Sequence, residues 1–389
     1  MALDPDTLAQ FLETIRRFVR ERLVPAEEGV AESDRVPPGI IAEMRQLGLF
    51  GMTIPERHGG LGLSMSEEVQ VLFELCRTSP AFRSVHGTNN GIGSQGIVID
   101  GSEEQKKKYL PDVAKGKRLA AFGLTEANAG SDAAGIRTEA RKVGDDYVLN
   151  GTKQWITNGG EAEVYSVIAM TDRGKGGRGA TAFIVEKGME GFSFGKKEKK
   201  LGIRASATRE LVFQDCKVPR ENVIGREGMG FILAMRTFDR TRPGIGAQGV
   251  GVAQGALEAA VAYAKEREQF DKKIISFQAV QHMLADMAIQ VEAARALVYA
   301  VARYIDSSPR DFSKASAISK VFPSDTAMKV TVDALQIFGG YGYMREYPIE
   351  KMVRDAKILQ IYEGTNQIQR NMIALELIKE AASSKKRQQ

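Results

Sequence analysis

The sequence predicts an α+β protein in which a helical block is followed by a β block and then by a second helical block. Three observations predict this order. Apolar residues repeat at helical spacing near the N-terminus, short β-rich runs with turn signals fill the middle, and a long seam with helical spacing follows residue 229. At 389 residues the chain can form two or three domains, and we expect them over 1–118, 119–228 and 229–389.

The first block reads as a series of helices. Pro25 is expected to end the first of them, because proline lacks the N–H that a helix interior needs. Pro37-Pro38 and the turn Gly59-Gly60-Leu61-Gly62 then separate further short helices. The first helix itself is predicted from apolar residues at helical spacing, which are Leu8, Phe11, Leu12, Ile15, Phe18 and Val19.

The second block has the alternation and turn signals of β-structure. Asp146–Leu149, the dipeptide Asn150-Gly151 and Thr152–Thr157 predict a hairpin, because Asn-Gly takes the positive φ angles of a type I′ turn. Several strands without helices between them predict an antiparallel barrel or sandwich, and not a parallel nucleotide-binding sheet. The further β-rich runs are Val164–Thr171, Ala180–Glu186 and Glu210–Val218.

The third block is helical again. Its apolar residues step alternately by four and by three through one long segment, which is the narrow seam that a helix buries in a bundle. This seam comprises Val280, Leu284, Met287, Val291, Ala294, Val298, Val301 and Ile305.

Composition excludes several classes of protein. The chain is 43% hydrophobic and 26% charged, and no apolar run is long enough to span a bilayer, so we expect no membrane association. The acidic, polar N-terminus resembles neither a secretion signal nor a transit peptide, and we therefore expect a cytoplasmic protein. The 2 cysteines form no CxxC pair and the 3 histidines have no ligand spacing, so we expect no metal site.

Glycine motifs and charge exclude further functions. The chain has a net charge of +5, which suits phosphate-bearing small ligands and leaves nucleic-acid binding open. Two GxGxxG matches, at 91–96 and 244–249, lie in helical blocks, where small residues let helices pack closely. We therefore reject a Rossmann fold. Neither a Walker A sequence nor a GxSxG elbow is present.

Three segments carry residues suited to binding and catalysis. Thr125–Asp132 is rich in small residues, amides and hydroxyls, and fits either an extended polar ligand or an ordinary turn. Trp155, the only tryptophan, fits either the core or the flank of a planar ring. Ile361–Arg370 places Glu363 before a glycine and small polar residues, as either a catalytic carboxylate or a helix stop.

These segments and others resemble the acyl-CoA dehydrogenases. Thr125-Glu-Ala-Asn-Ala-Gly-Ser-Asp132 and Trp155-Ile-Thr-Asn-Gly159 are similar to the flavin-binding signature of that family. One position departs from it, since Ala127 stands where the family usually has proline. Further motifs match in the same order over essentially the whole chain, namely Lys200–Thr208, Phe238–Pro243, Arg267–Phe270, Gln336–Gly340, Arg354–Lys357 and Tyr362–Thr365.

The resemblance implies the fold and the cofactor site. It implies the acyl-CoA dehydrogenase fold, with an N-terminal helical domain, a middle antiparallel β-barrel and a C-terminal four-helix bundle. It also implies FAD as cofactor and a homotetramer, in which a neighbouring subunit meets the adenine and pyrophosphate. The flavin and ribityl residues would be Phe122, Leu124, Thr125, Gly130, Ser131, Trp155, Ile156 and Thr157, with Thr365, Asn366 and Gln367 closing over them. Those from the neighbouring subunit would be Arg267, Gln269, Phe270, Phe277, Gln278, Gln336, Ile337, Phe338, Gly339 and Gly340.

The resemblance also implies the reaction and its residues. Glu363 would abstract the α-proton of an acyl-CoA thioester, a hydride would pass to flavin N5, and electrons would go on to an electron-transfer flavoprotein. Some branches of the family carry the base at the position of Thr241, but threonine cannot serve, so Glu363 is the candidate. Ser131, Asp239, Arg242 and Gly364 fall where the family contacts the acyl-CoA.

Three alternatives stay open within this resemblance. Arg83-Ser84 has the spacing seen in glutaryl-CoA dehydrogenases, where the arginine binds the distal carboxylate of the acyl chain; an exposed or structurally paired arginine is the other interpretation. An acyl-CoA oxidase would differ in whether oxygen reaches the reduced flavin. A DNA-binding flavoprotein of the same superfamily would carry an additional basic C-terminal domain, and we expect no nucleic-acid binding.

Overall fold

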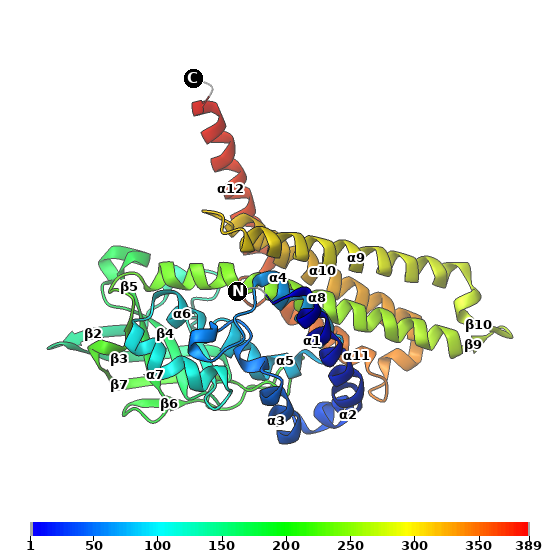
Figure 1. The fold of residues 1–389 in the computed structure, drawn as a ribbon, viewed down its shortest axis with the longest axis horizontal. Helices are drawn as coiled ribbons and strands as arrows, with labels where there is room; N and C mark the ends of the chain where they lie inside the picture. The colour runs from blue at the N-terminus through cyan, green and yellow to red at the C-terminus, as the bar shows by residue number, and fades with distance from the viewer. Residues whose placement is uncertain (1–2, 388–389) are drawn as a thin grey trace.

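The computed structural model describes residues 3–387, with side chains described to residue 383. The sheet lies at one end of the molecule, the N-terminal helices cross its middle, and the long C-terminal helices extend to the other end (Figure 1). The predicted α, β, α order is confirmed. The N-terminal helices are α1 (Pro5–Phe18), α2 (Val24–Ser33), α3 (Pro38–Gln46), α4 (Met65–Leu75), α5 (Pro80–Asn90), α6 (Gln95–Asp100) and α7 (Glu103–Ala114).

Pro25 does not end the first helix, contrary to the prediction. The chain runs from α1 through a π-helical turn, Val19–Leu23, directly into α2. Pro25 occupies the first turn of α2, where a helix leaves its N–H groups without intrahelical partners anyway. The π turn just before Pro25 is wider than an α-helical turn, and it accommodates the change in backbone hydrogen bonding next to the proline. The helix ends at Asp34, whose φ of 51° is left-handed.

The middle block forms one 8-stranded sheet with the strand order β6-β7-β3-β2-β4-β5-β8, and β1 pairs in parallel with β4. The long pairings β3–β7 and β4–β5 are antiparallel, as predicted. Within residues 3–387, β6 and β8 are not paired with each other, so hydrogen bonds do not close the sheet into a complete barrel. The strands are β1 (Ala120–Gly123), β2 (Glu139–Val143), β3 (Asp146–Thr157), β4 (Val164–Met170), β5 (Ala180–Glu186), β6 (Phe192–Phe194), β7 (Thr208–Val218) and β8 (Val223–Ile224).

The hairpin predicted at Asn150-Gly151 is wrong. β3 runs through these residues, and the register against β7 shifts between Leu149 and Gly151. Gly151 takes a φ of 140°, and a Cβ on it would lie 2.8 Å from the Thr138 Cα, so the dipeptide supplies a bulge. The turn signal was therefore real but marked an irregularity inside a strand. The tight turn is instead at 144–145, between β2 and β3.

The C-terminal block is built on three long helices, α8 (Gly230–Glu266), α9 (Gln278–Asp306) and α10 (Ser313–Phe338), with α11 (Ile349–Ala356) packed against α10. The predicted seam of α9 is confirmed, since Met287, Val291, Ala294 and Val298 are fully buried. The glycines of 244–249 allow close helix packing, as predicted. A Cβ on Gly249 would lie 2.8 Å from the Pro323 carbonyl oxygen of α10.

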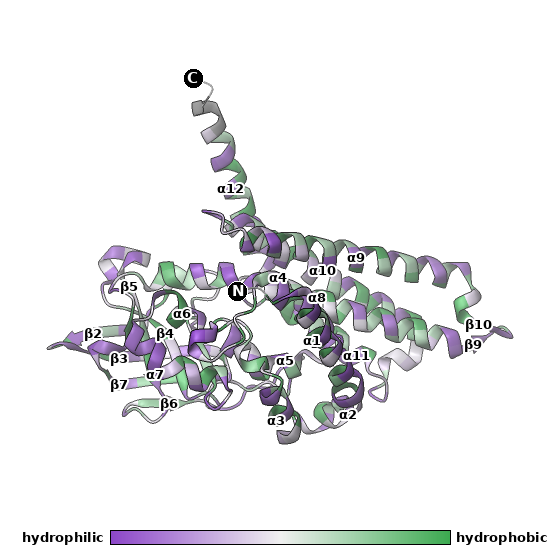
Figure 2. Cartoon of the chain, in the orientation of Figure 1, coloured by the Kyte–Doolittle hydropathy of each residue, from purple (hydrophilic) through white to green (hydrophobic). Residues whose placement is uncertain are grey.

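The last helix, α12 (Asn366–Arg387), starts against α10 and projects from the body (Figure 1). Hydrophobic stretches run along it (Figure 2), and Leu375, Leu377 and Ile378 are 56%, 53% and 65% exposed. An exposed apolar face of this kind marks an interaction surface. Within residues 3–387, none of the helices combines the length and apolar character needed to cross a membrane.

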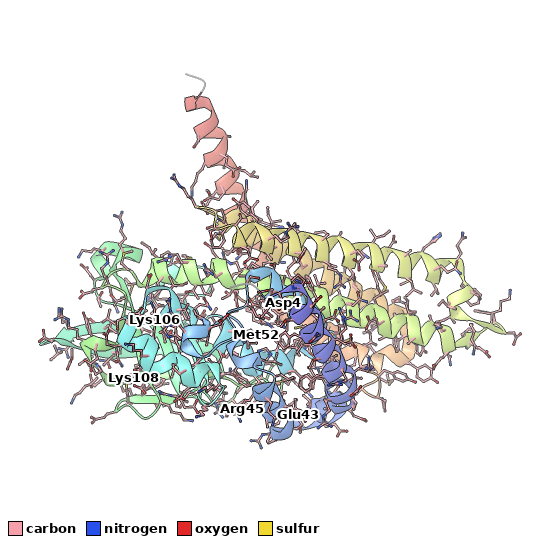
Figure 3. All side chains as sticks on the ribbon, in the orientation of Figure 1. Asp4, Glu43, Arg45, Met52, Lys106 and Lys108 are labelled. Carbon is pink, nitrogen blue, oxygen red and sulfur yellow. The ribbon has the colours of Figure 1, made fainter. Side chains whose placement is uncertain are left out.

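Contacts between the blocks fix their relative placement. Lys108 on α7, labelled in Figure 3, makes a 2.9 Å ion pair with Glu186 of β5 and so ties the N-terminal helices to the sheet. In addition, α4 packs against both α8 and α9. The three blocks therefore meet in one region, and the candidate site lies there.

Candidate active site

A cavity of about 1090 Å³ opens where the three blocks meet. Its walls come from α4 and α5, from β1, β3 and the neighbouring loops, from α8, and from the segment between α11 and α12. Ligand pockets in proteins typically measure ~300–1,000 Å³. The cavity therefore lies at the upper end of the size range of ligand pockets.

Glu363 lines this cavity from the turn that precedes α12. Its φ of 53° is left-handed, a conformation that costs a residue with a side chain about 1–3 kcal/mol. Gly364 follows with a φ of 89°, and a Cβ there would collide with Gln369 Nε2. From behind the turn, Gln369 Nε2 and Arg242 Nε donate to the Glu363 carbonyl oxygen at 3.2 Å and 3.3 Å. These donors hold the strained turn, so that the carboxylate has a fixed direction.

Among the side chains described, the Glu363 carboxylate accepts one hydrogen bond, from Thr241 Oγ1 on α8 at 2.6 Å. Burial raises its pKa, while this hydrogen bond and the cations Arg83, Arg242 and Lys320 act against the rise. Among the described residues, the Glu363 backbone N–H donates to no protein acceptor. The site therefore combines a half-buried carboxylate of raised pKa with a free backbone donor.

Lys320 supports the same turn from the side of α10. It is fully buried, and its ammonium group donates to the Gly364 carbonyl oxygen at 2.9 Å and to Asn366 Oδ1 at 2.8 Å. Burial lowers the pKa of Lys320 to about 7. The Asn366 amide in turn donates to Ser324 Oγ at 2.9 Å and to Asp325 Oδ1 at 2.8 Å. The Asn366 side chain is thus committed to α10 and does not line the cavity.

The β block contributes an aromatic and polar wall. Trp155 has a φ of 58° and lies within the second register shift of β3, between Lys153 and Ile156. The wall is fixed from behind by a buried ion pair of 2.8 Å between Lys153 and Glu126. A flat aromatic group beside a loop of hydroxyls fits a planar ring with a polar chain, as in a flavin. Eight residues predicted to bind flavin line the cavity, and these are Phe122, Leu124, Thr125, Gly130, Ser131, Trp155, Ile156 and Thr157.

Comparison with known families identifies the fold around this site. Models of the acyl-CoA dehydrogenase N-terminal, middle and C-terminal domains match residues 5–117, 121–216 and 228–378. The chain belongs to the acyl-CoA dehydrogenase family. It is 46% identical over 375 residues to the probable acyl-CoA dehydrogenase fadE25 of Mycobacterium leprae, covering 96% of each chain.

Two solved structures share this fold. Butyryl-CoA dehydrogenase from Megasphaera elsdenii has a TM-score of 0.93 and 44% identity, and the match covers 97% of this chain and 100% of that one. A chain in a structure described as the electron transferring flavoprotein of Acidaminococcus fermentans has a TM-score of 0.93 and 46% identity, covering 97% of this chain and 99% of that one.

Most of the remaining residues that the acyl-CoA dehydrogenase resemblance assigns to the cofactor lie away from the cavity, whereas Asn366 and Gln367 directly follow Thr365, which lines it. The hairpin of β9 (Glu268–Gln269) and β10 (Lys272–Lys273) lies at the far end of the C-terminal helices from the sheet (Figure 1). Phe270 is 87% exposed there, and the Arg267 guanidinium lies 5.1 Å from the centre of the Tyr341 ring. Ile337 and Phe338 are buried in the bundle core. Those that do not line the cavity are Arg267, Gln269, Phe270, Phe277, Gln278, Gln336, Ile337, Phe338, Gly339, Gly340, Asn366 and Gln367.

The residues assigned to substrate lie in or beside the cavity. Ser131, Arg242 and Gly364 line it, together with Thr365. Asp239 does not line it but accepts a 2.7 Å hydrogen bond from Arg242 Nη1, and it thereby orients that guanidinium.

Arg83 also lines the cavity. Its Nη1 donates to Gln248 Oε1 at 2.8 Å, and its Nε is buried without a hydrogen-bond partner. Sequence reasoning missed Glu68 of α4, which lines the cavity opposite Gly244, and Lys320 beneath the turn. Neither belongs to a recognisable motif, and helical periodicity alone would place a charged residue on the surface.

Proposed function

We propose that the protein catalyses the FAD-dependent α,β-dehydrogenation of an acyl-CoA thioester to a trans-2-enoyl-CoA, with Glu363 as the α-proton base. The observation that carries this proposal is the half-buried Glu363 carboxylate, with its raised pKa, directed into a cavity whose opposite wall suits a flavin. When bound, FAD supplies the acceptor for the β-hydrogen, which leaves as a hydride. The protein itself binds the thioester, removes the α-proton and excludes water.

The proton transfer is supported by three features around Glu363. Thr241 orients the carboxylate through its 2.6 Å hydrogen bond, and burial raises the carboxyl pKa toward that of a useful base at neutral pH. The free Glu363 N–H is available to the thioester oxygen, where negative charge develops as the α-proton leaves. A positioned base contributes about 10²–10⁴-fold, so both effects are needed for a fast reaction.

For the cofactor, we propose that Thr125, Ser131, Trp155 and Thr157 hold the isoalloxazine and ribityl groups. The distant group that includes Arg267 and Gln336 can reach the cofactor only from another subunit, which supports a homotetramer. The exposed apolar residues of α12 provide further surface for such an assembly. A cytoplasmic location remains a prediction from the sequence.

Two observations bear on the substrate and on the electron acceptor. The Arg83 guanidinium faces the cavity without a carboxylate partner among the described residues, which favours an acyl chain with a distal anionic group as a second candidate substrate. The match to a chain from an electron transferring flavoprotein structure supports such a flavoprotein as the acceptor, over the oxygen that an oxidase would use. We propose no nucleic-acid function.

An anaerobic screen tests the proposed function. The FAD-loaded protein is mixed with straight-chain acyl-CoAs of increasing length and with dicarboxylyl-CoAs, and loss of flavin absorbance is followed. We expect bleaching by at least one series and formation of enoyl-CoA, with reoxidation by an electron-transfer flavoprotein and slow reoxidation by air. No bleaching by any acyl-CoA would contradict the proposal, and rapid peroxide formation would favour an oxidase.

A further inference from the structure

Two opposite charges face the cavity near Gly244 without closing on each other. Glu68 of α4 is only 7% exposed, yet its carboxylate has no hydrogen bond or ion pair with any of the side chains described, those of residues 3–383. Arg83 of α5 binds Gln248 and has a buried Nε without a partner. A Cβ placed on Gly244 would lie 3.4 Å from Arg83 Nη2 and 3.6 Å from Glu68 Oε1. The two groups therefore flank the same point on α8.

This arrangement is costly unless a ligand completes it. The Glu68 carboxyl group is buried, and Arg83 is half-buried with a buried Nε; a polar or charged group left unsatisfied in a protein interior costs free energy. Gln248 accepts from both Arg83 Nη1, at 2.8 Å, and the Tyr362 hydroxyl, at 3.1 Å, so it holds the guanidinium in place. The unused Arg83 donors and the Glu68 carboxyl group remain available to a polar group on a substrate.

We propose that Arg83 and Glu68 form one receptor for a carboxylate at the far end of the acyl chain, in which Glu68 is a specificity-determining residue. As the carboxylic acid, Glu68 donates a hydrogen bond to the carboxylate that Arg83 holds; as the carboxylate, it repels that group and neutralises Arg83. This inference rests on the proposed acyl-CoA function, and it adds a proton-controlled preference to the candidate role of Arg83.

The charges around Glu68 make this control possible near neutral pH. Burial raises the pKa of Glu68 to about 7; Glu363 and Asp306 add to the rise, and Arg83 opposes it. Three other titratable groups near Arg83 stay neutral there, since burial lowers the pKa of His86 to about 3, raises that of Cys76 to about 12 and raises that of Tyr362.

The sign of the pH effect follows. A group with a raised pKa keeps its proton below that pKa, so the receptor is competent below about pH 7 and is lost as the pH rises through this value. The tail carboxylate of a dicarboxylyl chain has an ordinary pKa of about 4.3 and is ionised throughout this range. Over this pH range the substrate carboxylate therefore keeps its charge, and only the protonation of Glu68 changes.

The test measures binding without turnover, in the Glu363→Gln protein loaded with FAD. This background also removes the titration of Glu363, together with its share of the rise in the Glu68 pKa, which burial still raises. Isothermal titration calorimetry gives the Kd of glutaryl-CoA and of pentanoyl-CoA, which share the same chain length, at pH 6 and pH 8. Using the ratio of the two Kd values cancels effects common to both thioesters, including any titration of Lys320.

We expect the preference for glutaryl-CoA to fall about tenfold from pH 6 to pH 8, which is the loss expected for a hydrogen bond to a charged group. Adding Glu68→Gln should keep the preference equal at both pH values, and adding Arg83→Met should abolish it at both. A preference that does not change with pH, or that still changes in Glu68→Gln, would overturn the inference. Because no catalysis is measured, a negative acyl-CoA screen with the wild-type protein would count against the proposed reaction separately.

Discussion

Replacing Thr241 with valine tests how the protein sets the basicity of Glu363. Valine has nearly the same shape as threonine but lacks the hydroxyl that donates to Glu363 Oε2 at 2.6 Å. This is the only hydrogen bond that the carboxylate accepts among the described residues, and it lowers a pKa that burial raises. Removing it should therefore raise the pKa of Glu363 further.

The size of the change follows from the type of bond. A hydrogen bond to a charged group contributes about 1.5–3 kcal/mol, and each pKa unit corresponds to about 1.4 kcal/mol. Because the hydroxyl favours the ionised carboxylate, Thr241→Val should raise the pKa of Glu363 further. Since the base acts as the carboxylate, activity that is lost as the pH falls through this pKa will be lost at a correspondingly higher pH.

The assay is the pH dependence of kcat/KM for one good acyl-CoA substrate, with FAD content measured for each variant. Thr241→Ser is the matched control, because it keeps the hydroxyl and should keep the acid limb of the profile near that of the wild type. An acid limb that does not move in Thr241→Val would refute the reasoning, as would an equal shift in both variants.

Three other variants probe the support of the site. Lys320→Met removes the two hydrogen bonds that Lys320 donates to the turn. At about 1 kcal/mol per bond, kcat should fall more than tenfold, while FAD content stays unchanged. A normal kcat would contradict this role. Gly364→Ala places a side chain on a residue with a φ of 89°, which adds about 1–3 kcal/mol of backbone strain. The rate of flavin reduction, followed by stopped-flow absorbance, should therefore fall. Lys153→Met leaves the buried Glu126 carboxylate with hydrogen bonds from Arg137 and Thr138 but without its cation. It should lower the unfolding free energy by about 3–5 kcal/mol in urea titration and weaken FAD retention; wild-type stability would contradict it.

Much of the site could be predicted because its residues lie in short segments with a strong local pattern. Thr125 and Ser131 follow a strand in a loop of small polar residues, and Glu363 precedes a glycine that the turn requires at a φ of 89°. Local turn chemistry of this kind is visible in a sequence. The α, β, α order was equally visible, because the spacing of apolar residues changes twice along the chain.

Other features could not be predicted because they depend on tertiary packing. Pro25 reads as a helix stop, but a π turn before it lets the helix continue. Asn150-Gly151 reads as a hairpin turn, but β7 pairs along its whole length and converts the dipeptide into a bulge. Local sequence rules predict the conformation that a segment prefers, but packing against a neighbouring strand or helix determines the conformation that it adopts.

The charged residues around Glu363 show the same limit. Lys320 and Glu68 lie on helices whose buried sides are determined by packing between the blocks. The sequence alone therefore gives no sign that both side chains are buried. The residues near Arg267 and Gln336 raise a different difficulty, because a single chain holds them far from the cavity. Their proposed role depends on an assembly of subunits.

The central claim is that Glu363 removes the α-proton, and the rate of anaerobic flavin bleaching in Glu363→Gln tests it most directly. Glutamine preserves the size of the side chain and removes the base, so FAD content and acyl-CoA binding should be retained. We predict that the bleaching rate falls by about 10²–10⁴-fold relative to the wild-type protein. An undiminished bleaching rate in FAD-loaded Glu363→Gln would contradict the claim.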